Sequence, residues 1–133
     1  MIEMRIIVDA SAVMSVLLNE PAKENLIARS QGASLVAPGS LRWEIGNALS
    51  SWLKRHRITE KEAAAILDEY ARIPIQSVEV DLKAALSLSA KHSIYAYDAY
   101  VVLAAKQYRL PLLTLDASMK EIAKKEKIKI LEV

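Results

Sequence analysis

The chain has 133 residues, 53% of them hydrophobic and none of them cysteine, which fits a single domain over residues 1–133 with a sizeable core and excludes disulfides and thiolate metal sites. Its 18 basic and 16 acidic residues leave a net charge of only +2, which does not by itself indicate a nucleic-acid-binding protein. The sequence contains neither a secretion signal nor the roughly 20 consecutive apolar residues of a membrane span, so we expect a protein of the reducing cytoplasm with no membrane partner.

The predicted elements alternate between short buried strands and amphipathic helices. Residues 5–8 are a β-branched run that predicts the first strand, and the segment after Asp9 has helical spacing. Ser40 can cap the helix that carries Glu44, and Thr59 with Glu62 forms a capping box before the next helix. The further strands are predicted at 35–37, 75–80, 112–115 and 128–131, with helices from Asp81 and Asp116. Such apolar strands separated by helices predict a three-layer α/β/α sandwich around a mainly parallel, five-stranded sheet.

Four acidic residues are expected at one edge of this sheet. Asp9 and Asp116 each directly follow a predicted strand, and ligands of parallel sheets bind beyond the carboxyl ends of the strands. Glu44 and Asp98 lie near helix starts at the same edge. Clustered carboxylates raise one another's pKa unless a cation neutralises them, and Mg²⁺ and Mn²⁺ prefer such oxygen ligands. The arrangement suits hydrolysis of a phosphodiester, because metal ions activate water and stabilise the entering and leaving oxygens.

Each acid also has a simpler structural interpretation. Asp116 can be the N-cap of a helix, and Asp98 can offset a helix dipole from the first turn. Glu44 lies beside a buried helical stripe, where an unpaired carboxylate is costly. Asp9 has no capping partner as obvious as a metal, which makes it the strongest single candidate.

The segments around these acids resemble the PIN domain, in particular the toxin nucleases of prokaryotic VapBC-type toxin–antitoxin pairs. Each segment contains one of the four acids, and together they follow the family's order and spacing at residues 7–12, 43–49, 97–104 and 113–116. The resemblance covers nearly the whole chain. It implies the PIN-like sandwich and a Mg²⁺- or Mn²⁺-dependent endoribonuclease, often a homodimer, that a cognate antitoxin holds inactive.

The resemblance also implies a role for each site residue. Asp9, Asp98 and Asp116 would be metal ligands, direct or through water, and Glu44 would complete the acidic cluster or orient the attacking water. Supporting positions near the ligands would be held by Ser11, Thr114 and Asn47. No acid before Glu121 matches a fifth ligand of some PIN nucleases, which leaves open whether one or two metals bind.

Other residues are assigned to the substrate or to the surface. Arg42 is expected to contact RNA, and Tyr97 lies among tyrosines around Asp98 that can stack on unpaired bases. The lysines of 120–129 alternate with Glu121 and Glu126, which predicts a solvated face. The two histidines, His56 and His92, are expected at the surface. A homodimer would use the apolar helix faces of 62–71 and around Trp52.

Two other functions stay open. A receiver-like or phosphatase-like α/β domain also has an Asp after its first strand, where it accepts phosphate covalently. The phosphatase pattern has a second Asp two residues on, and this chain has Ser11 there. A PIN-like domain that has lost catalysis and only binds RNA or protein would lack one or more of the acids, and all four are present.

Overall fold

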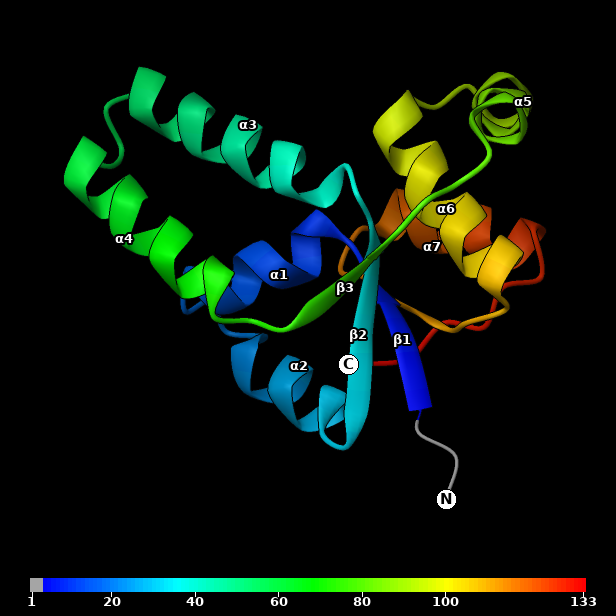
Figure 1. Ribbon diagram of the computed structural model, residues 1–133, viewed down its shortest axis with the longest axis horizontal. Coiled ribbons are helices and arrows are strands. Elements are labelled where there is room, and N and C mark those ends of the chain that lie inside the picture. The colour runs from blue at the N-terminus through cyan, green and yellow to red at the C-terminus, as the bar shows by residue number, and fades with distance from the viewer. Residues whose placement is uncertain (1–3) are drawn as a thin grey trace.

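The computed structural model describes residues 4–133, which form a parallel sheet covered by helices on both sides (Figure 1). The strands pair in the order β3-β2-β1-β4, all parallel. They are β1 (Met4–Val8), β2 (Ala33–Pro38), β3 (Ile75–Val78) and β4 (Leu112–Leu113). The helices are α1 (Ala10–Leu17), α2 (Lys23–Ser30), α3 (Leu41–Lys54), α4 (Glu60–Ala71), α5 (Leu82–His92), α6 (Ala96–Tyr108) and α7 (Ala117–Lys125). The predicted α/β sandwich with a parallel sheet is confirmed.

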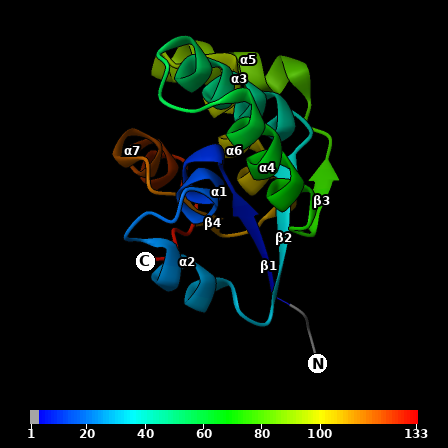
Figure 2. The ribbon, with the colours of Figure 1, turned by 90° about the vertical axis from the view of Figure 1, so that its left-hand side faces the viewer.

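The strands supply two hydrophobic cores, one on each face of the sheet. Ile7 and Leu112 pack in the core formed with α5, α6 and α7. Their neighbours in sequence, Ile6 and Leu113, pack in the core formed with α1 to α4. Figure 1 shows these two groups of helices on opposite sides of β1 and β2, and Figure 2 shows the same layers from the side. Because both faces are covered, the strands are apolar at successive positions rather than at alternate ones.

The sheet in residues 4–133 has four strands rather than the five predicted. At 128–131 the chain makes only an isolated parallel bridge between Ile130 and Leu112. The Leu112 amide donates to the Lys129 carbonyl, and the Leu131 amide donates to the Leu112 carbonyl, both at 2.9 Å. Strand β4 is itself only two residues long, with Pro111 before it, so a neighbouring strand has little ladder to extend.

The predicted helix starts agree with the structure more closely than the predicted strands do. The capping box is present, since the Thr59 hydroxyl accepts from the Glu62 amide and the Glu62 carboxylate accepts from the Thr59 amide, both at 3.1 Å. Asp81 and Asp116 are N-caps of α5 and α7. Ser40 does not cap α3, because its own backbone is already helical and its hydroxyl makes no cap hydrogen bond.

Glu126, at the end of α7, ties the C-terminal helices together and is not on a solvated face as predicted. Its side chain is 2% exposed and binds Lys91 and His92 of α5 and Lys106 of α6 at 2.7–2.8 Å. Hydrogen bonds from Lys106, Lys91 and His92 lower the pKa of Glu126 to about 2. The His92 side chain is only 7% exposed, so its predicted surface position is wrong. Its burial depends on a residue 34 positions away, which local sequence does not show.

The sequence predicts neither a membrane span nor a secretion signal, and the structure bears on these expectations only for the residues that it describes. Among residues 4–133, no helix is long and apolar enough to cross a membrane. Residues 1–3, which belong to the N-terminal segment expected to lack a secretion signal, lie outside the described residues.

Candidate active site

The four predicted acids line one small pocket, although they come from four different elements. Asp9 follows β1 and Asp116 lies three residues after the end of β4. Glu44 is in the first turn of α3 and Asp98 is in the first turn of α6. The pocket has a volume of about 130 Å³ and is lined by Asp9, Ala10, Ser11, Glu44, Asp98, Val101, Asp116 and Met119.

Asp9 is the most deeply buried of these acids, at 3% exposed. One carboxylate oxygen, Oδ1, accepts from the Ser11 hydroxyl at 2.8 Å and from the Ala12 amide at 3.1 Å. The other, Oδ2, accepts from the Thr114 hydroxyl at 2.5 Å and from Ser11 at 2.9 Å. Burial raises the pKa of Asp9 against the opposing effect of these hydrogen bonds. Asp9 is also the N-cap of α1, a capping role that the sequence alone did not indicate.

Ser11 and Thr114 join the two loops that carry Asp9 and Asp116. Besides their bonds to Asp9, the Ser11 hydroxyl accepts from the Leu115 amide and the Thr114 hydroxyl accepts from the Asp116 amide, both at 3.0 Å. Thr114 is fully buried, which fixes the position of its hydroxyl. Asn47, the third residue assigned to this group, is exposed on α3 and does not line the pocket.

The negative charges at Glu44 and Asp98 are not compensated within the pocket. Burial, together with the charges of Asp98 and Asp9, raises the pKa of Glu44 to about 7. Burial, followed by the charges of Asp116 and Asp9, also raises the pKa of Asp98. No basic side chain is among the described residues that line the pocket. A proton or a bound cation would therefore offset the charge within the pocket.

Asp116 caps a helix and lines the pocket at the same time. Its Oδ1 accepts from the Ser118 amide at 2.9 Å and from the Met119 amide at 3.2 Å, as the simpler interpretation predicted. Both cap bonds are made by the same carboxylate oxygen. The capping role is therefore compatible with a second role for this side chain in the pocket.

The donor set fits a hydrated hard cation better than a metal enclosed by protein ligands. Within residues 4–133, no three acidic or imidazole side chains are arranged as a ready-made metal-binding group. Mg²⁺ commonly binds through one or two carboxylates and keeps several waters, with substrate phosphates as further ligands. Four carboxylates with uncompensated charge around a pocket suit this mode, and Mn²⁺ takes the same ligands.

The two predicted substrate contacts lie outside the pocket, each near an acid in sequence. Arg42 is exposed, with its guanidinium carbon 4.3 Å from the centre of the Trp43 ring. Tyr97 is 43% exposed and packs edge-on against Tyr100, with ring centres 6.1 Å apart.

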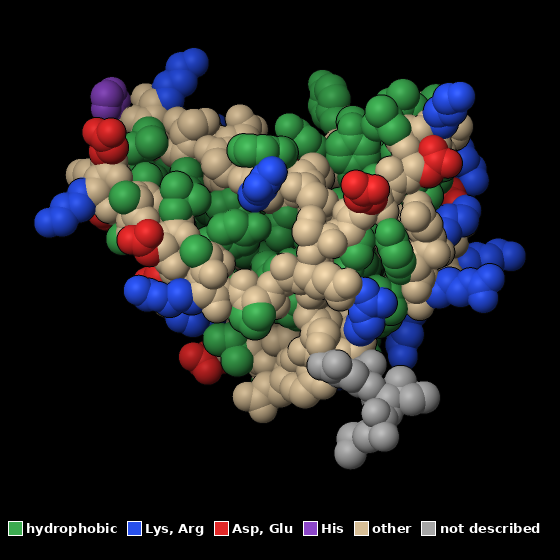
Figure 3. Space-filling model, in the orientation of Figure 1, with side chains coloured by type: hydrophobic (Ala, Val, Ile, Leu, Met, Phe, Trp, Pro, Cys, Tyr) green, Lys and Arg blue, Asp and Glu red, His purple; other side chains and the backbone are tan. Residues whose placement is uncertain are grey.

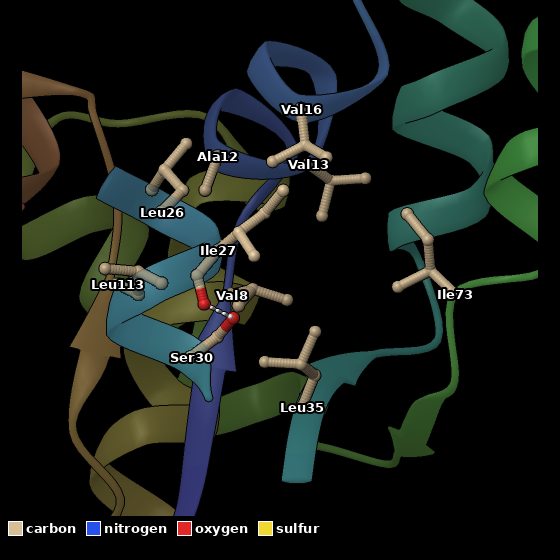
Figure 4. A pocket seen from close by; sticks show the side chains of 10 residues that line it. All are labelled: Val8, Ala12, Val13, Val16, Leu26, Ile27, Ser30, Leu35, Ile73 and Leu113. Atoms are coloured by element: carbon tan, nitrogen blue, oxygen red, sulfur yellow. Dashed lines mark hydrogen bonds between the residues drawn. The ribbon is translucent and has the colours of Figure 1, made fainter. Parts of the chain in front are cut away.

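A second, apolar pocket of about 280 Å³ lies on the α1–α4 side of the sheet (Figure 4). Hydrophobic side chains gather over α1 in the hollow beside α4 (Figure 3). Ser30 is the one polar residue of its lining, and its hydroxyl donates to the Ile27 carbonyl. The lining residues are Val8, Ala12, Val13, Val16, Leu26, Ile27, Ser30, Leu35, Ile73 and Leu113. The sequence does not reveal this pocket, because its lining residues come from segments far apart in the chain.

Comparison with known proteins gives a matching family and several proteins of similar sequence or structure. The family model of the PIN domain matches residues 6–125. Ribonuclease VapC12 of Mycobacterium tuberculosis is 27% identical over 116 residues, which cover 86% of this chain and 88% of that protein. PAE2754 from Pyrobaculum aerophilum has a similar structure, with a TM-score of 0.73, 21% identity and coverage of 92% of this chain and 81% of that one. VapBC2 from Rickettsia felis, solved with a promoter DNA fragment, gives a TM-score of 0.67 at 13% identity and covers 97% of this chain and 98% of that one.

Proposed function

This chain belongs to the PIN domain family, and from that premise we propose that it is a divalent-metal-dependent endoribonuclease that hydrolyses phosphodiester bonds of RNA in the cytoplasm. The observation that carries the proposal is the pocket in which four carboxylates meet without a basic partner. The similarity to a protein named as a ribonuclease supports RNA as the substrate.

The proposed roles follow from the geometry of the pocket. Asp9, Glu44, Asp98 and Asp116 would hold Mg²⁺ or Mn²⁺, directly or through water. A bound cation would polarise the scissile phosphate and lower the pKa of the attacking water. Glu44 completes the acidic cluster or orients that water. The hydroxyls of Ser11 and Thr114 hold the Asp9 carboxylate in place, which is the task of residues behind a metal ligand.

Replacing Asp9 by Asn tests the proposal. Asn keeps the shape of the side chain and is an equally good N-cap, so the fold should survive, whereas the charge toward the cation is lost. We expect EDTA-sensitive cleavage of RNA by the parent and a loss of at least about 100-fold in the variant. Mn²⁺ should raise the melting temperature of the parent and not of the variant.

The exposed Asp68 on α4 supplies a matched control, since Asp68→Asn removes the same charge away from the pocket. Full EDTA-sensitive cleavage by Asp9→Asn, with an unchanged response to Mn²⁺, would show that Asp9 is only structural. Circular dichroism of both variants establishes that the comparison is made between folded proteins.

We further propose that this nuclease is the toxin of a VapBC-type pair and acts as a homodimer. The similarity to the VapBC2 structure supports a protein partner. The apolar pocket is the surface on which an apolar segment of an antitoxin would lie, because its lining is almost entirely aliphatic (Figure 4). The exposed Leu67 on α4 belongs to the helix face proposed for the dimer.

A further inference from the structure

The exposed aromatic side chains of this chain all lie next to an acid of the pocket in sequence. The chain has two tryptophans, five tyrosines and no phenylalanine. Three of these are exposed, namely Trp43 at 59%, Tyr95 at 88% and Tyr97 at 43%. Trp43 directly precedes Glu44, and Tyr95 and Tyr97 lie within three residues of Asp98. The other four aromatic side chains are half-buried.

Core packing does not explain the positions of Trp43 and Tyr97. On α3 the buried stripe is Leu41, Ile45 and Leu49, and Trp43 lies away from it. Instead, these two exposed rings each contact a neighbouring side chain, Trp43 the Arg42 guanidinium and Tyr97 the ring of Tyr100. Rings held at the surface in this way are ready to bind a partner without a large loss of conformational freedom.

The surroundings of the two rings favour a nucleic acid over a protein surface. Glu44 and Asp98 line the same pocket, so the helix starts that carry Trp43 and Tyr97 border the place where a phosphate would be cleaved. Arg42 brings a positive charge that can contact the phosphate backbone beside the Trp43 ring. Aromatic rings beside a cationic group are the usual means of holding unpaired bases.

We propose that Trp43 and Tyr97 stack on unpaired bases that flank the phosphate in the acidic pocket. The inference rests on the proposed ribonuclease function and assigns two residues that position its substrate. Bases within a continuous duplex already stack on one another and expose no free face to these rings. Single-stranded loops and ends therefore bind, and an uninterrupted duplex binds weakly.

Tryptophan fluorescence tests this inference directly, because the chain has only two tryptophans. Trp52→Phe leaves Trp43 as the sole reporter, and Trp43→Phe leaves Trp52. Titration with single-stranded oligouridylate, in Ca²⁺ and again in EDTA, should quench Trp43 in a saturable manner and leave Trp52 unchanged. A duplex of equal length should quench Trp43 much less. A gel of the recovered RNA shows whether it stayed intact.

Affinity measured with end-labelled oligouridylate supplies the second readout. Trp43→Ala and Tyr97→Ala should each raise the Kd at least about fivefold, since a base stacked on an aromatic ring contributes that much or more. Trp43→Phe should stay close to the parent, because phenylalanine also stacks. Leu86→Ala removes an aliphatic side chain that is 52% exposed on α5, outside the acidic pocket and the proposed dimer face, and should leave the Kd unchanged.

Three results would overturn the inference. The first is constant Trp43 fluorescence up to about 100 μM RNA, the weak end of non-specific nucleic-acid affinity. The second is an unchanged Kd in both alanine variants. The third is a Trp43→Ala protein that turns from dimer to monomer with unchanged RNA affinity, which would make the ring a self-association surface.

Parallel cleavage assays in Mg²⁺ distinguish failure of this inference from failure of the proposed function. Quenching without cleavage would contradict the ribonuclease proposal, and cleavage without quenching would contradict the stacking proposal.

Discussion

At the scale of single residues, the Asp9 carboxylate serves both the fold and the site. Three groups donate to it, the hydroxyls of Ser11 and Thr114 and the Ala12 amide. These bonds cap α1 and connect β1 to the loop after β4, and they also fix the direction of the carboxylate before any cation binds. Because the Asp9 carboxylate is already held in one orientation, the site loses little conformational entropy when it binds a cation. The raised pKa of Asp9 shows that its burial is still unfavourable to the charge.

The pKa of Glu44 predicts that the metal-free protein loses stability as the pH rises. In the folded protein this pKa is raised from 4.5 to about 7, chiefly by burial. Between these values the folded state binds more protons than the unfolded state, so the free energy of unfolding falls with increasing pH. Asp9 and Asp98 shift in the same direction. Urea unfolding in EDTA from pH 5 to pH 8 should show this decline.

The variant Glu44→Gln isolates the contribution of this side chain. It removes the group that titrates near pH 7 and relieves repulsion with Asp98, so it should flatten the decline and raise the melting temperature at pH 8. Stability of the parent that rises through this pH range, or a decline that is the same in Glu44→Gln, would show that Glu44 does not carry the shift.

At the scale of elements, Glu126 holds α5, α6 and α7 together through charged hydrogen bonds. We expect Glu126→Gln to destabilise the protein by about 1–3 kcal/mol at pH 7, because its bonds to Lys91, His92 and Lys106 lose the carboxylate charge. The folded-state pKa is lowered from 4.5 to about 2, so this stability is present above pH 4.5 and is lost as the pH falls through 2. The difference between variant and parent should therefore shrink at pH 3.

Urea unfolding at both pH values measures this effect, and Glu121→Gln is the matched control. Glu121 is exposed on the same helix, so its charge contributes little. Equal stability of Glu126→Gln and Glu121→Gln at pH 7 would show that the cluster forms without stabilising the fold.

The elements also show where sequence was sufficient for prediction and where it was not. The capping box at Thr59 and the acids that follow β1 and β4 depend on neighbours within a few residues, and these were predicted. Helix α2 was not, because Leu26 is its only buried residue and its apolar pattern is weak. The fifth strand and the solvated position of Glu126 were predicted wrongly, since both depend on contacts made by residues far away in the chain.

At the scale of the whole molecule, the acidic pocket lies where the two layers of helices meet. Asp9 and Glu44 belong to α1 and α3 on one face, and Asp98 and Asp116 belong to α6 and α7 on the other. The apolar pocket belongs to the first face alone, yet it comes close to the site. Val8 lines it and directly precedes Asp9. A partner bound in the apolar pocket would thus contact the residues that position Asp9.

We therefore expect the antitoxin to bind in the apolar pocket, and Ile27→Asp tests this. Ile27 lines the pocket and is 39% exposed, so the fold should tolerate the change, whereas a partner would have to bury an unpaired carboxylate. The affinity for the proposed antitoxin, a protein encoded beside this gene, should fall more than about tenfold. Leu86→Asp, at an exposed position (52%) on α5 outside this pocket and the proposed dimer face, should retain it. Both variants should cleave RNA like the parent, and the partner should inhibit only Leu86→Asp. If it binds and inhibits Ile27→Asp equally well, the antitoxin acts through another surface.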